Sequence, residues 1–129
     1  MKIIALALVT ILALLHFYIA WFEMFAWTTK GPEVFDTLPP DLFAQTTQLA
    51  ANQGIYNAFL AVGLSWSLFI KDVKWQFNIA ACFLGFVAVA GIVAAITVAV
   101  KSGAVQFIPA SVALVLLVLS RKSASPANT

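Results

Sequence analysis

Charged side chains are scarce in this sequence. Only 9% of the 129 residues are Asp, Glu, Lys or Arg, whereas 63% are hydrophobic. A soluble domain carries about a quarter charged residues, so the composition predicts an integral membrane protein. The net charge of +2 is not gathered into a basic cluster, and we therefore expect no nucleic-acid partner.

Cysteine and histidine each occur once, as Cys82 and His16. A single cysteine excludes a disulfide within the chain, and one histidine without a thiolate partner gives too few strong ligands for zinc. Glycine-rich nucleotide loops and serine nucleophile elbows are also missing. We expect neither a metal nor a cofactor.

Four long apolar runs dominate what is present. They predict transmembrane helices at residues 3–27, 53–70, 77–100 and 105–120, followed by a tail at 121–129. A helix of roughly 20 residues crosses a bilayer core of about 30 Å, and backbone groups in lipid must be paired within the segment. The expected fold is an all-α, four-helix transmembrane bundle forming one domain. The first run is too long for a signal peptide and is expected to be retained.

The longest connection, Thr28 to Asn52, is expected to be external. Its first half, TTKGPEVFDTLPP, is rich in turn residues, whereas DLFAQTTQLAANQ predicts a short helix leading into the second span. Pro109 is expected in the first turns of the fourth span, where its missing N–H matters least.

Lysine and arginine positions predict the orientation. One side of the membrane receives five of them (Lys2, Lys71, Lys74, Arg121 and Lys122), and the other side receives Lys30 and Lys101. Because cytoplasmic loops carry the excess of positive charge, both termini are expected to be cytoplasmic.

Small residues four apart mark the third span. Ala81 with Gly85, and Gly91 with Ala95, have the spacing that lets helices approach closely in a membrane. The pattern predicts a central helix or a contact between copies in a homo-oligomer.

Two ionisable residues interrupt the first span. His16 and Glu23 are seven residues apart, which places them within about 20° of each other on one helical stripe and about 10 Å apart. Since a charge facing lipid is costly, both should face the bundle interior. They are also the candidate acid and base.

The second span brings further polar groups to the height of Glu23. Gln53 and Asn57 share one helical face with Tyr56 at its edge. We expect a polar pocket in the outer half of the bundle. Its predicted ligand-binding residues are Glu23, Gln53, Asn57, Tyr56 and His16, with Tyr18, Thr97 and Gln106 as further lining groups.

The strings LHFYIAWFEMFAW and LAANQGIYNAFLAVGL resemble the characteristic segments of a family of small bacterial membrane proteins, domain of unknown function 1304. The resemblance implies a four-helix membrane fold in a bacterial inner (plasma) membrane, and it implies no activity. The residues that fit the family pattern are His16, Glu23, Trp27, Asn52, Gln53, Gly54, Tyr56 and Asn57.

Three classes of function fit these features. The first is a membrane protein that binds or passes a small, largely apolar molecule or a proton at the polar pocket. The second is an enzyme that uses His16 and Glu23 for acid and base chemistry on a lipophilic substrate. The third is a structural or accessory subunit, in which the same groups hold helices together. The only partners expected are the lipid bilayer, such a ligand and further copies of the chain.

Overall fold

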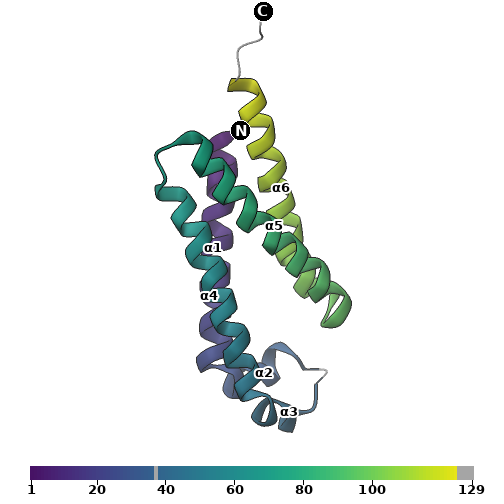
Figure 1. Cartoon of the computed structure of the whole chain (residues 1–129). Coiled ribbons are helices and arrows are strands. Elements are labelled where there is room, and N and C mark those ends of the chain that lie inside the picture. Colours follow the sequence, from purple (N-terminus) through teal and green to yellow (C-terminus); the bar gives the residue numbers. More distant parts are fainter. Residues whose placement is uncertain (37, 125–129) are drawn as a thin grey trace, which may run out of the picture. The chain divides into compact units, whose positions relative to one another are not determined.

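The computed structural model describes residues 1–36 and 38–124, with side chains as far as Arg121. Within these residues the chain forms six helices joined by short connections, without a strand (Figure 1). The helices are α1 Lys2–Phe25, α2 Trp27–Val34, α3 Pro40–Gln45, α4 Thr47–Phe69, α5 Val73–Thr97 and α6 Val100–Ala124. They form two compact units, described separately below: the Leu14–Ala61 unit, and the α5–α6 unit, which joins Met1–Ala13 to the described residues from Val62 onward.

Three helices of the described chain, α1, α5 and α6, are long and apolar enough to cross a membrane. The expected bundle of four transmembrane helices is therefore not confirmed. The helix that differs from expectation is α4, which has 23 residues but begins with the polar sequence TQLAANQ. The amides of this sequence, together with Asn57, lower the hydropathy of a helix that is otherwise long enough.

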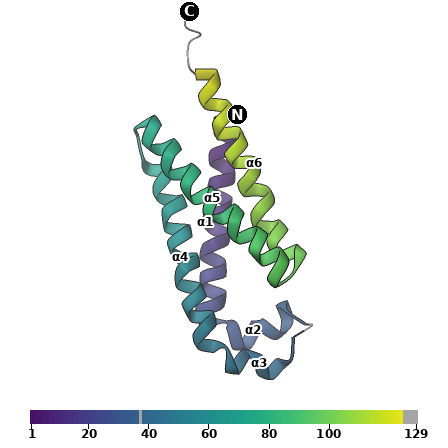
Figure 2. The ribbon, with the colours of Figure 1, turned by 45° about the vertical axis from the view of Figure 1, so that its right-hand side comes forward.

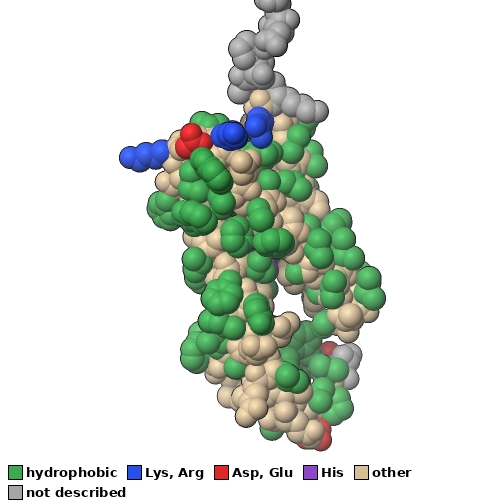
Figure 3. All heavy atoms as spheres, viewed as in Figure 1, with side chains coloured by type: hydrophobic (Ala, Val, Ile, Leu, Met, Phe, Trp, Pro, Cys, Tyr) green, Lys and Arg blue, Asp and Glu red, His purple; other side chains and the backbone are tan. Residues whose placement is uncertain are grey.

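Large apolar side chains lie on the outside of the helices. On α1, Ile3 is 84% exposed and Phe25 is 73% exposed, whereas the buried stripe contains Ala5, Val9 and Ala20. Figure 3 shows hydrophobic side chains along the visible face of the helices. Large exposed apolar surfaces of this kind are typical of a protein that contacts a membrane. This pattern supports membrane insertion of the chain.

In the α5–α6 unit, α5 and α6 lie side by side as an antiparallel pair (Figures 1 and 2). A Cβ atom on Gly103 would fall on the carbonyl oxygen of Gly91, and one on Gly91 would lie 2.7 Å from the backbone nitrogen of Phe107. At the other end of the pair, the Arg121 guanidinium lies 4.7 Å from the ring centroid of Phe77. Glycine thus permits backbone contact at one end of the α5–α6 pair, and a cation–π contact links the two helices at the other end.

Of the two small-residue pairs predicted to allow close helix contact in the third span, only one lies at such a contact. Gly91, with Ala95 beside it, packs against Gly103, but a Cβ on Gly85 would meet nothing within 4 Å. Gly103 itself was expected in the connection, and it is helical because only Val98 and Ala99 separate α5 from α6. The expectation for Pro109 is wrong for the same reason: α6 starts early, so Pro109 lies inside it.

The Leu14–Ala61 unit contains the last turns of α1, the short helices α2 and α3, and the first turns of α4. The segment TTKGPEV was expected as turns, but it continues from Trp27 as α2, with Pro32 inside the helix. Four aromatic rings from α1 to α3 explain why. Trp27 lies with its ring centroid 5.7 Å from Phe22, 5.9 Å from Phe35 and 5.2 Å from Phe43.

Gly31 and Thr46 complete this aromatic packing. A Cβ on Gly31 would enter the ring of Phe43, so only glycine allows α2 to lie this close to α3. The indole Nε1 of Trp27 donates to Thr46 Oγ1 over 2.9 Å, and that hydroxyl donates to the carbonyl oxygen of Leu42. The expected short helix before the second span is present as α3. Thr46 is the single residue that separates it from α4.

The first predicted span agrees with α1 to within two residues at each end, whereas α5 and α6 begin four and five residues before the predicted third and fourth spans. The second span was expected from residue 53, whereas α4 begins at Thr47, two turns earlier. The expected tail at 121–129 overlaps the end of α6, and residues 125–129 lie outside the described part of the chain. The predicted external connection is therefore mostly helical, with Phe35 to Pro39 between α2 and α3.

Candidate functional site

Gly54 and Ala20 bring α4 and α1 together in the Leu14–Ala61 unit. A Cβ on Gly54 would lie 3.1 Å from the carbonyl oxygen of Ala20 and 3.3 Å from the Cβ of Glu23. Ala20 and Gly54 are both buried. The contact between these two backbones allows side chains as short as that of asparagine to reach across from one helix to the other.

Asn57 uses this proximity to join His16 and Glu23. It lies three residues after Gly54 on α4, facing α1. Its Oδ1 lies 2.8 Å from Nδ1 of His16, and its Nδ2 donates to Oε2 of Glu23 over 2.8 Å. Nδ2 also lies 3.2 Å from the backbone carbonyl oxygen of Gln53. The two ionisable residues of α1, expected about 10 Å apart, are thus linked by one carboxamide.

His16 is the most buried member of this cluster. Its relative exposure is 0%, and among the described residues no group forms a hydrogen bond with its Nε2. It belongs to the same stripe of α1 as buried Val9, Ala13 and Ala20. The expectation that the imidazole faces the protein interior agrees with this burial. An unpaired buried nitrogen is costly, so Nε2 is open to a further partner.

Glu23 is half-buried and is hydrogen-bonded through one carboxylate oxygen. In the described part of the chain, Asn57 is its only hydrogen-bond donor, and no lysine or arginine forms an ion pair with it. The carboxylate can therefore accept further donors, since each of its oxygens offers two lone pairs.

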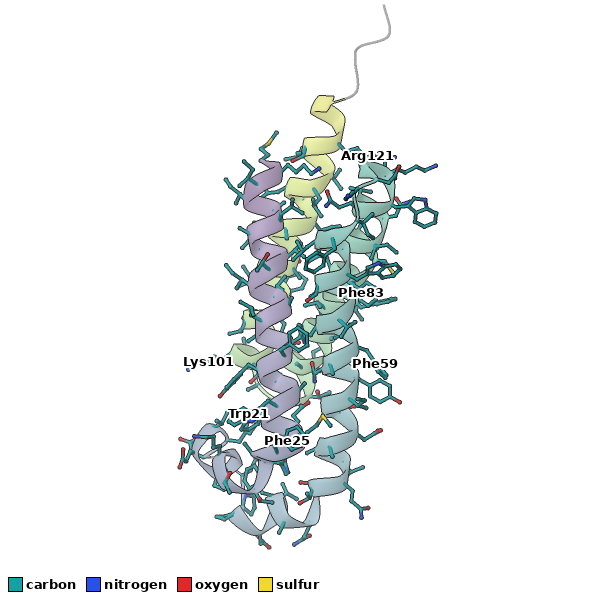
Figure 4. All side chains as sticks on the ribbon, turned by 90° about the vertical axis from the view of Figure 1, so that its left-hand side faces the viewer. Trp21, Phe25, Phe59, Phe83, Lys101 and Arg121 are labelled. Atoms are coloured by element: carbon teal, nitrogen blue, oxygen red, sulfur yellow. The ribbon has the colours of Figure 1, made fainter. Side chains whose placement is uncertain are left out.

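The side chains of the other predicted pocket residues form no hydrogen bond with this cluster in the described part of the chain. The side chain of Gln53 is exposed, and only its backbone carbonyl contacts Asn57. Tyr56 is 55% exposed and packs against Phe59, and Tyr18 is 53% exposed beside Trp21. Figure 4 shows the exposed rings of Trp21 and Phe25 on the last turns of α1 and that of Phe59 on α4.

Thr97 and Gln106 belong to the α5–α6 unit. Thr97 Oγ1 donates to the carbonyl oxygen of Val93, and Gln106 Nε2 donates to that of Ser102. Each of these polar side chains therefore pairs with its own helix. Their expected role in the pocket remains a prediction.

The carboxamide limits what the cluster can do chemically. An amide neither releases nor takes up a proton as readily as imidazole or carboxylate, so Asn57 orients His16 and Glu23 without transferring protons between them. Proton exchange or ligand contact at His16 must use Nε2, because Nδ1 faces Asn57. In the described residues, no group of three His, Cys, Asp or Glu side chains lies close enough to hold a metal ion.

Three contributions were missed by sequence reasoning. Neither Ala20, the backbone carbonyl of Gln53 nor Thr46 was predicted to contribute. Helical spacing could have identified the first, since Ala20 lies four residues after His16 and three before Glu23. No signal in the sequence marks a backbone carbonyl as a hydrogen-bond partner.

Comparisons with known proteins give a family but no activity. A family model described as "Protein of unknown function (DUF1304)" matches residues 10–118. An uncharacterised protein of Lactococcus lactis, YpaA, is 33% identical over 78 residues, which are 59% of this chain and 66% of that protein. The match thus spans just under two thirds of the relative's length. No solved structure matches the chain. The family match includes His16, Glu23 and Asn57.

Proposed function

The chain belongs to the DUF1304 family of proteins of unknown function, and we propose that it binds or passes a small, largely apolar molecule or a proton at the cluster of His16, Asn57 and Glu23. The observation that carries the proposal is the buried imidazole, held by Asn57 on one side and without a partner at Nε2. Most buried side-chain nitrogens are hydrogen-bonded, so the unpaired Nε2 leaves a position for a further partner.

The surroundings of the cluster support an apolar ligand. Phe17, Tyr18 and Trp21 on α1 and Ile55 and Phe59 on α4 are exposed within the Leu14–Ala61 unit. A molecule arriving through lipid meets apolar side chains of these two helices first. The few polar groups of the cluster can then fix its orientation, as in most small-molecule sites.

We further propose that α4 crosses the membrane with α1, α5 and α6. Its Asn57 has its hydrogen-bonding groups occupied by α1 and by its own helix. This pairing lowers the cost of placing the amide in lipid. With four crossings both termini share one side, and we place them in the cytoplasm of a bacterial plasma membrane. Lys and Arg gather where α4 meets α5 and where α6 ends, within the α5–α6 unit (Figure 3), in keeping with this orientation.

Native mass spectrometry of gently extracted protein tests the binding proposal. Wild type is compared with Glu23→Gln and Asn57→Ala, and Gln53→Ala is the matched control because that side chain is exposed. We expect a small molecule retained by wild type and Gln53→Ala, and lost from Asn57→Ala. Equal retention by all four proteins, or no bound mass in wild type, would contradict the proposal.

A structural or accessory role is the second candidate, because Asn57 joins two helices through its hydrogen bonds. It predicts that Asn57→Ala lowers the melting temperature while no ligand copurifies with the wild type. An enzyme acting through His16 and Glu23 predicts instead that Glu23→Gln removes turnover of a lipophilic substrate from a protein that still folds.

A further inference from the structure

The orientation of the Asn57 carboxamide follows from its three neighbours. The backbone carbonyl oxygen of Gln53 can only accept hydrogen bonds, and it lies 3.2 Å from one terminal atom of Asn57. That atom must be the nitrogen, because an oxygen there would place two acceptors against each other. The same atom lies 2.8 Å from Glu23 Oε2. Both hydrogens of Nδ2 are thereby used, one for each acceptor.

This orientation fixes the tautomer of His16. The remaining terminal atom of Asn57 is its oxygen, an acceptor, and it lies 2.8 Å from Nδ1 of the imidazole. Nδ1 must therefore carry the hydrogen of that bond. In a neutral imidazole one nitrogen is a donor and the other an acceptor, so Nε2 carries a bare lone pair. The chain holds this acceptor fully buried and gives it no donor among the described residues.

We propose that Nε2 of His16 accepts a hydrogen bond from an O–H donor, and that the ligand of the cluster is an alcohol whose hydroxyl occupies this position. A buried water molecule presents the same chemistry and is the other source of the donor. A carbonyl, ether or carboxylate compound cannot satisfy a bare lone pair, so the site selects against ligands that only accept hydrogen bonds. The alcohol source rests on the proposed function, whereas the tautomer and the need for a hydrogen-bond donor at Nε2 do not.

The single histidine of the chain makes the test direct. Protein labelled with [15N]histidine, purified without a histidine tag and placed in lipid nanodiscs, gives imidazole signals from His16 alone. At a pH of about 8, above the ordinary histidine pKa of about 6.5, we expect Nδ1 to be protonated. Nε2 should be unprotonated, with the chemical shift of a nitrogen that accepts a hydrogen bond. The signals are recorded with 1-octanol, with octane and without additive.

Each outcome decides the proposal. A shift of the Nε2 signal with octanol but not with octane supports an alcohol ligand. An Nε2 signal that is hydrogen-bonded, insensitive to octanol and in contact with exchangeable water protons supports the O–H donor and identifies it as water. A hydrogen on Nε2, or an Nε2 without any hydrogen bond, would overturn the inference. Native mass spectrometry could then still find a ligand, so failure here is distinct from failure of the proposed function.

Variants separate the role of Asn57 from a general loss of structure. Asn57→Ala removes the acceptor that faces Nδ1, and we expect the preference for the Nδ1–H tautomer to be lost. Glu23→Gln still offers an oxygen to Nδ2 of Asn57, and Gln53→Ala keeps the backbone carbonyl, so both should keep the wild-type tautomer. If Asn57→Ala does not fold, the proposal stands or falls on these two variants and on wild type.

Discussion

Gly54 of α4 lies against Ala20 of α1, so close that a Cβ on the glycine would lie 3.1 Å from the alanine carbonyl oxygen. This contact lies between the two residues that Asn57 joins, since His16 and Glu23 flank Ala20 on α1. The backbone approach is therefore a condition for the cluster and not a separate packing feature.

Gly54→Ala tests that condition. The added Cβ would run into the side chain of Met24 and press on the carbonyl oxygen of Ala20. The Met24 side chain can turn away, but the Ala20 carbonyl oxygen can give way only if its helix shifts, so α1 and α4 should separate by a few tenths of an ångström. We expect a loss of about 1 to 2 kcal/mol in the free energy of unfolding, measured by reversible denaturation in bicelles. The Nδ1–H signal of His16 should also weaken. An unchanged stability would show that the helices are not this close.

Gly103→Ala tests the packing of α5 on α6. The new Cβ would fall on the backbone oxygen of Gly91 and 2.5 Å from the backbone nitrogen of Ala95, neither of which can move alone. We expect a loss of about 2 kcal/mol or more in stability. Gly85→Ala is the matched control, because a Cβ there meets nothing within 4 Å. It should be neutral or stabilise the helix by up to about 1 kcal/mol. Equal effects of the two substitutions would contradict the described packing.

Trp27→Phe tests how α2 is held to the start of α4. The substitution keeps a ring among Phe22, Phe35 and Phe43 but removes the donor to Thr46 Oγ1. A net hydrogen bond contributes about 1 kcal/mol, and we expect the loss to appear as faster hydrogen exchange at α2 and α3. Trp75→Phe is the control, because Trp75 is 59% exposed and lies in the α5–α6 unit. Equal exchange in both variants would argue against the bond.

Helical periodicity predicted a large part of the site. A spacing of seven positions puts His16 and Glu23 on one stripe, and α1 is a regular helix, so their common direction could be read from the sequence. The link through Asn57 could not. It depends on the distance between α1 and α4. Gly54 determines this distance through its contacts with α1, and these contacts cannot be predicted from residue spacing within one helix.

The connection was harder to predict than the long helices. Gly31 and Pro32 indicate a turn by their own preferences, yet they lie inside α2 because the ring of Phe43 covers the glycine. The start of α4 was easier to predict. The segment that contains the amides at 48, 52 and 53 was expected to be helical, and these residues lie on the first turns of α4. In α2, tertiary contacts outweighed local preference.

The central claim is that His16, Asn57 and Glu23 act as one hydrogen-bonded unit, and a double-mutant cycle between residues 23 and 57 tests it most directly. Stability is measured for Glu23→Ala, Asn57→Ala and the double variant, with a parallel cycle of Glu23→Ala and Gln53→Ala as control. We predict a coupling of about 0.5 to 1.5 kcal/mol between Glu23 and Asn57 and none in the control cycle. Additive effects within about 0.3 kcal/mol in both cycles would show that the carboxamide and the carboxylate do not interact.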